Sequence, residues 1–299
     1  MSEAGQAIAA VAEDVSPKPR FRAWWFGLLT VAVAVLYYDT LARLVRNWWE
    51  DPNFSHGFLV PAFAVFVAWQ HRSELVKIPH RPKSWGLAVI IGSALMLIVG
   101  TLGAELFLAR CSFIVLLAGM TVYFAGFAQF RALLFPWACL FSAVPLPAII
   151  LNEITFPLQL VAAQLAAQML SLFGVPVLRE GNILQIPSMS MEMADACSGI
   201  RSLVSLVLLA VVFGYVVHAK RSWRVLLAVL AVPVAIFANG VRITTTGIVA
   251  QYWSPDRAEG FFHEFSGVFV FAVSLVAFFF VYRALRALSR PAAGSDAQS

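Results

Sequence analysis

The sequence predicts an all-α polytopic membrane protein. Of its 299 residues, 61% are hydrophobic and 12% are charged, whereas soluble domains average about 45–50% apolar and about 25% charged residues. Nine apolar runs follow one another along the chain, at about 23–38, 57–70, 85–102, 106–126, 132–150, 154–173, 197–217, 223–252 and 265–285. Because a bilayer span needs about 20 apolar residues, we expect one membrane-embedded bundle and no large soluble domain.

Clusters of basic residues give the sidedness of these runs. Cytoplasmic loops of membrane proteins are enriched in Lys and Arg, and four such clusters lie between or beside runs. They contain Lys18, Arg20 and Arg22; Arg72, Lys77, Arg81 and Lys83; Lys220, Arg221 and Arg224; and Arg283, Arg286 and Arg290. Placing all four in the cytoplasm predicts about eight spans with both termini inside. The net charge of +5 therefore reflects topology, and no nucleic-acid partner is expected.

The sixth run differs from the others. The seventh run must enter from outside to bring Lys220 and Arg221 to the cytoplasm, so the sixth cannot cross. Three glutamines interrupt its apolar surface, at positions 159, 164 and 168, and Pro157 and Gly174 bracket it. We expect an outer interfacial or re-entrant helix over 154–173, with a ninth span as the alternative.

Polar segments surround and interrupt the membrane domain. The loop at 175–196 contains "EGN" between two strand-like pieces, which favours a small extracytoplasmic hairpin. Residues 1–22 have no apolar core of their own and are expected to form a disordered cytoplasmic tail. The membrane domain then covers 23–288, and 289–299 forms a second cytoplasmic tail.

One of the three cysteines has a polar setting. Cys111 and Cys139 lie inside apolar runs, where a thiol usually acts as a small hydrophobe. Cys197 instead begins the seventh run in "MADACSGIRSL", between Asp195 and Ser198, with Arg201 four residues later. A helix N-terminus and a nearby cation increase the thiolate fraction, so Cys197 is the candidate nucleophile. Arg201 could equally pair with Asp195 or Glu192.

The next two runs bring further polar groups to the same depth. The eighth carries Asn239 and Arg242, three residues apart and so on one helix face. The ninth begins near "FFHEFSG", which contains His263. A thiol, a guanidinium and an imidazole at one depth could form a nucleophile, an oxyanion-stabilising cation and a base. The alternatives are a snorkelling Arg242 and an interfacial His263.

Metal binding fits the sequence less well. A zinc site from Cys197, His263 and His56 would lack the helical ligand pair of an HExxH motif. The cysteines also show no paired ligand spacing and no disulfide framework. We therefore expect no metal and no cofactor.

At these residues the sequence resembles the exosortase family of membrane transpeptidases. The resemblance rests on "ACSGIRS" (196–202), "NGVR" (239–242), the histidine of "FFHEFSG" (261–267) and "SHGFLVP" (55–61). It implies that Cys197 is the nucleophile and that Arg242 and His263 are its partners. His56, Asp195, Ser198, Arg201 and Asn239 would support the site.

The resemblance also implies the substrate and the cellular location. The substrates would be exported proteins ending in a PEP-type motif, a transmembrane helix and a basic tail. The enzyme would lie in a bacterial inner membrane with its active site facing the periplasm. A transporter with a polar pathway and a non-catalytic component of envelope polysaccharide assembly are the rival functions. Against a transporter, the chain shows no inverted repeat.

The topology is testable with reporter fusions. Fusions after Lys83 and Arg224 should report a cytoplasmic location, because basic loops stay inside. Fusions within 178–192 should report an extracytoplasmic location. A cytoplasmic signal from 178–192 would contradict the shared depth of Cys197, Arg242 and His263.

Overall fold

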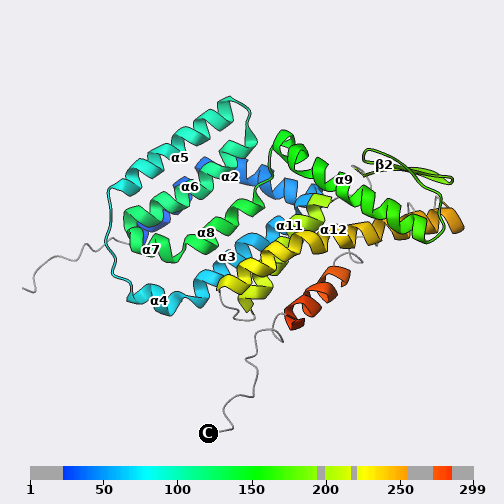
Figure 1. Ribbon diagram of the computed structural model, residues 1–299. Coiled ribbons are helices and arrows are strands. Elements are labelled where there is room, and N and C mark those ends of the chain that lie inside the picture. Colours follow the sequence, from blue (N-terminus) through cyan, green and yellow to red (C-terminus); the bar gives the residue numbers. More distant parts are fainter. Residues whose placement is uncertain (1–22, 194–198, 217–220, 255–271, 285–299) are drawn as a thin grey trace, which may run out of the picture. The chain divides into compact units, whose positions relative to one another are not determined.

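The structure is a computed structural model that describes residues 23–193, 199–216, 221–254 and 272–284 (Figure 1). The chain divides into two compact units, Met1–Arg43 and Leu44–Ser299, which are described separately below. The described residues form helices and one small sheet, so the expected class of a helical membrane protein is confirmed. Five of these helices are long and apolar enough to cross a membrane.

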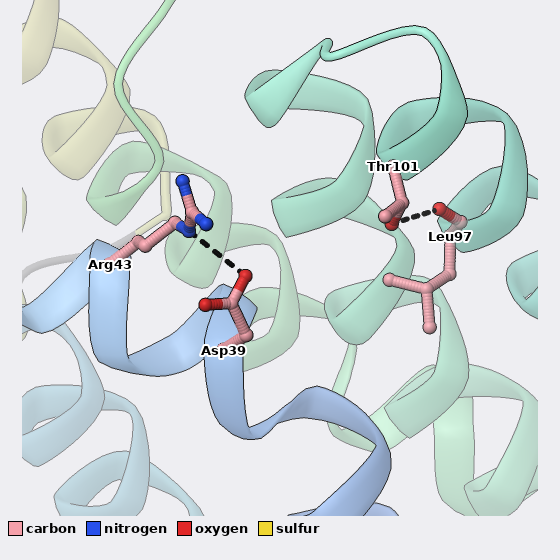
Figure 2. Close-up of polar contacts among 4 residues, drawn as sticks. All are labelled: Asp39, Arg43, Leu97 and Thr101. Atoms are coloured by element: carbon pink, nitrogen blue, oxygen red, sulfur yellow. Dashed lines mark hydrogen bonds and ion pairs between the residues drawn. The ribbon is translucent and has the colours of Figure 1, made fainter.

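In the first unit, the described residues belong to helix α2. This helix spans Ala23–Glu50, so it continues well beyond the apolar run at 23–38. Charged residues one turn apart compensate each other there: Arg43 Nε lies 2.9 Å from Asp39 Oδ2 (Figure 2). The pair is exposed, so its net contribution to stability is small.

In the second unit, helices α5 and α6 form a tight antiparallel pair. They span Trp85–Leu102 and Leu106–Phe124, close to the predicted runs at 85–102 and 106–126. Glycines allow the close approach, because a Cβ at Gly100 would lie 2.6 Å from the backbone nitrogen of Ala109. The Thr101 hydroxyl donates to Leu97 O at 2.7 Å (Figure 2), so this polar group is satisfied within its own helix, as lipid surroundings require.

Short elements occupy the stretches around the second and fifth runs. They are η1 (Pro52–Phe58), α3 (Leu59–Gln70), α4 (Arg72–Lys77), α7 (Phe127–Ala132), α8 (Leu134–Cys139) and η2 (Leu140–Ala143). The fifth run, expected as one span over 132–150, is therefore divided. The division has a local cause: Pro145 and Pro147 lack a backbone N–H and force the residue before them into an extended conformation. Val144 accordingly has φ −91° and ψ 119°.

Three long helices and one shorter helix follow. They are α9 (Ala148–Leu172), α11 (Gly199–Val216), α12 (Arg221–Tyr252) and an apolar helix over Ala272–Ala284. Helix α9 is continuous through Pro157 and begins six residues before the predicted run at 154–173. By length and composition it could cross a membrane. The interfacial placement of this run and the count of eight spans both stay predictions.

The predicted hairpin is present and has a third strand. Strands β1 (Leu178–Glu180), β2 (Ile183–Ile186) and β3 (Met189–Glu192) form an antiparallel sheet in that order. Gly181 makes the first turn with φ +64°, a conformation that favours glycine. One face of the sheet joins a buried cluster with α9 and α12 that includes Leu170, Leu184, Met191 and Ile243.

Candidate active site

The packing of α12 against α11 sets the geometry of the site. A Cβ at Gly214 of α11 would lie 3.3 Å from Arg224 Cγ and 3.4 Å from Leu227 Cδ1. The end of α11 therefore lies beside the beginning of α12, and the two helices run antiparallel. Their shared buried cluster contains Leu206, Ala210, Leu227, Ala231 and Ala235. This contact continues on both sides of Pro233, so the proline does not separate the helices.

This register brings Arg242 to the start of α11. Arg242 follows Leu227 by 15 residues, and Gly199 precedes Gly214 by 15 residues. Because an α-helix rises about 1.5 Å per residue, the two positions lie at about the same level. Gly199 is the first residue of α11 and comes two residues after Cys197.

Asn239 and Arg242 are both buried on α12. Their side chains are 5% and 6% exposed, in a helix that packs against α11 and α9. The expected placement on one helix face agrees with this joint burial. Asn239 Oδ1 has no hydrogen-bond partner within the described ranges. A buried carbonyl oxygen without a partner is costly, so this atom marks a position where a further donor would be stabilising.

His56 is held by the segment that precedes α9. It lies on η1, is 7% exposed, and its Nε2 lies 3.2 Å from Ser142 O. In the neutral ring this contact places the proton on Nε2. Nδ1 is then the acceptor nitrogen and is buried, and the backbone of Asn53 also lies near the ring.

A tryptophan fixes η1 beside the same segment. Trp48 Nε1 donates to Ala143 O at 2.8 Å in a buried hydrogen bond. A Cβ at Gly57 would collide with the Trp48 ring, so the glycine of "SHGFLVP" lets the indole lie directly on η1. The positions of Trp48 and Ser142 could not be predicted from the sequence, since their partners are 95 and 86 residues away along the chain.

Contacts of Tyr215 place η1 near the beginning of α11. Tyr215 lies near the end of α11, where its ring meets Phe63 of α3 at 6.0 Å and its hydroxyl lies 3.1 Å from His71 Nδ1. The end of α3 therefore lies beside the end of α11. Since η1 precedes α3 and also packs against α11, it lies toward the beginning of α11. His56 and Arg242 are thus at the same end of this helix.

A comparison with known families matches residues 48–280 to the family described as Transmembrane exosortase (Exosortase_EpsH). The chain belongs to this family. A comparison with curated proteins and one with solved structures gave no match. The matched range begins at Trp48 and includes η1, α11 and α12, the elements that carry the described candidate residues.

The candidate site residues predicted from sequence fall into three groups. The structure buries His56, Asn239 and Arg242 at one end of the second unit. Arg201 lies in the first turn of α11, but its side chain is not among those described. The other predicted residues lie outside the described ranges; they are Asp195, Cys197, Ser198 and His263.

The environment of His56 favours the uncharged ring. Burial lowers the pKa of His56, and it outweighs the opposite effect of the Ser142 and Asn53 carbonyls. Since the pKa of an unperturbed histidine is about 6.5, the ring is neutral at neutral pH. A neutral imidazole can accept a hydrogen bond or a proton, which a charged one cannot.

This pKa predicts how stability depends on pH. Below about pH 6.5 the unfolded chain binds a proton at His56 that the folded protein resists, so the folded state loses stability as the pH falls. His56→Gln keeps an N–H donor for Ser142 but cannot take up the proton. We expect the acid-side decrease in thermal stability to be smaller in His56→Gln than in wild type. Unfolding in detergent between about pH 5 and pH 8 measures this difference, and identical pH profiles would contradict it.

Proposed function

We propose that this exosortase is a membrane cysteine transpeptidase or protease that cleaves C-terminal PEP-type sorting signals of exported proteins. Family membership supports a membrane transpeptidase. The observation that carries the residue assignment is the helix register, which puts buried Arg242 level with the beginning of α11. Cys197 precedes that point by two residues.

Cys197 is the proposed nucleophile. A thiol just before a helix receives the partial positive charge of the helix N-terminus, which favours the thiolate. The guanidinium of Arg242 at the same level adds to this effect. Cys111 is buried in α6 and Cys139 ends α8, and neither begins a long helix.

His263 is the proposed base, and the connectivity of the chain supports this role. Phe278 packs in the cluster that joins α11 and α12, and the Phe213 and Tyr282 rings meet at 5.5 Å. The helix over Ala272–Ala284 therefore runs in the same direction as α11 and starts toward its beginning. Residues 255–271, which include His263, join the end of α12 to this helix.

The reaction proceeds through a thioester. His263 takes the proton of the Cys197 thiol, and the sulfur attacks the scissile carbonyl while Arg242 stabilises the oxyanion. The attack gives a tetrahedral intermediate. Its collapse breaks the scissile C–N bond, and His263 returns the proton to the leaving amine. An acceptor amine or water then attacks the thioester carbonyl and gives a proton to His263, and the C–S bond breaks to release the Cys197 thiolate.

The membrane setting fits a substrate that arrives within the bilayer. An exported protein with a C-terminal apolar helix and a basic cytoplasmic tail would present the residues before that helix at the outer surface. We propose that the protein lies in a bacterial inner membrane, with the site on its periplasmic side. His56, Asp195, Ser198, Arg201 and Asn239 would contact or position the bound segment.

The nucleophile is tested by comparing the three thiols. Cys197→Ala should abolish processing of a co-expressed protein that carries a PEP-type motif, an apolar helix and a basic tail. Cys197→Ser should also fail, because a hydroxyl ionises far less readily than a thiol. Cys111→Ala and Cys139→Ala serve as controls and should process near the wild-type level. A gel shift of the substrate measures cleavage, and normal processing by Cys197→Ala would refute the thiol mechanism.

The role of Arg242 is tested by a change that keeps its charge. Lysine cannot form the planar two-point contact of a guanidinium, so Arg242→Lys should lower the processing rate about 100-fold, the effect of losing one oxyanion donor. Protein abundance and thermal stability should remain near wild type. An unchanged rate would show that Arg242 does not contact the reacting group. Arg201→Lys is the comparison variant and should have a milder effect.

A further inference from the structure

Strand β3 has one edge whose backbone groups point away from the sheet. Met193 N donates to Asn182 O at 2.9 Å, so the backbone N–H of Met193 points toward the strand that contains β2. Antiparallel pairs alternate between hydrogen-bonded and non-hydrogen-bonded, and Leu184 pairs with Met191 in the same alternation. Ser190 and Glu192 occupy the intervening positions. Their N–H and C=O groups therefore point to the edge that is opposite β2.

Along β3 the side chains alternate between the buried face and the exposed face of the sheet. Met191 is 3% exposed and Met193 is fully buried in the cluster beneath the sheet, whereas Ser190 and Glu192 are exposed. Among the described residues, none forms a hydrogen bond with the outward backbone groups of these two residues. The edge thus offers two N–H donors and two C=O acceptors in the spacing of a β-ladder.

Strand β3 packs against α12 within two turns of Arg242. A Cβ at Gly247 of α12 would lie 3.3 Å from Met191 Cε, so β3 packs on α12 at that residue. Gly247 follows Arg242 by five residues, about 7.5 Å along the helix. Glu192 precedes Cys197 by five residues, a stretch that spans at most about 17 Å.

We propose that the outward edge of β3 binds the extended segment of the protein substrate as an additional strand. The inference rests on the proposed function and specifies how its substrate is held. Cleavage of a segment that joins an exported domain to a membrane helix requires an accessible, unfolded backbone. Strand addition holds such a backbone in an extended conformation through main-chain hydrogen bonds. Alternate side chains of the substrate can then be selected by pockets.

The opposite edge of the same sheet supplies a matched control. In β1, Leu178 and Glu180 pair with Gln185 and Ile183 of β2, whose backbone groups face β1. Arg179 therefore points its N–H and C=O outward, as Ser190 does on β3. Two strand spacings of about 4.8 Å separate the two edges, and β3 is the strand that directly precedes Cys197 in the sequence.

The first experiment maps the contact without requiring catalysis. Ser190→Cys and Arg179→Cys are each introduced into a chain whose three native cysteines are changed to Ala. The probe is a membrane-anchored reporter that ends in a PEP-type motif, an apolar helix and a basic tail, with single cysteines scanned through the motif. Facing residues in a ladder lie about 4.5–5.5 Å apart, close enough for a disulfide after mild oxidation.

Strand addition predicts disulfides between Ser190→Cys and every second reporter position. Arg179→Cys should form few or none. Equal adducts at both edges, adducts at every reporter position without alternation, or no adducts at the β3 edge would overturn the proposal.

The second experiment measures processing of the same reporter by chains that retain Cys197. Ser190→Pro removes an outward N–H and should lower processing about fivefold or more, the effect of losing one net hydrogen bond. Arg179→Pro removes an outward N–H at the other edge, so it should process near wild type. Failure of the wild-type chain to process the reporter would count against the proposed function. Wild-type processing with an equally active Ser190→Pro would count against strand addition alone.

Discussion

The close approach of α12 to its two neighbours underlies the arrangement of the candidate site. Small residues line both contacts: Ala231 and Ala235 face α11 in a shared cluster, and a Cβ at Gly240 or Gly247 would lie within 3 Å of a leucine on α9. Where lipid removes much of the hydrophobic driving force between helices, such close packing becomes a main source of association. It also fixes the helix register, and the register decides which residues share a level.

Polar groups are distributed unevenly along this helix assembly. At the end where α3 and α11 finish, Tyr215 and His71 contact each other. At the end where α11 begins, His56, Asn239 and Arg242 are each buried, and Asn239 Oδ1 has no hydrogen-bond partner among the described residues. Burial without full pairing destabilises a protein, so a hydrogen-bond donor beside Asn239 Oδ1 would be stabilising. The contrast between the two ends is the main structural argument for a site at the beginning of α11.

The irregular segment before α9 links distant parts of the second unit. Prolines at 145 and 147 prevent a helix from continuing, and the carbonyl groups just before them are therefore open to other donors. Ser142 O forms a hydrogen bond with the His56 ring, and Ala143 O accepts one from the Trp48 indole N–H. A regular helix would have used these carbonyls internally. Interruption of the fifth apolar run thus positions the histidine of η1.

The sequence by itself determined the membrane class, the ends of α5, the hairpin and the shared helix face of Asn239 and Arg242, because these depend on composition and on spacings of a few residues. Only the tertiary structure decided that the fifth run is divided, that Ser142 contacts His56, and that among the described residues no strand pairs with the outer edge of β3. Each of these depends on contacts between residues far apart in the chain, or on backbone groups that every residue type shares. Side-chain patterns cannot encode the direction in which a particular N–H points, and this is why the edge of β3 emerged only from the pairing register.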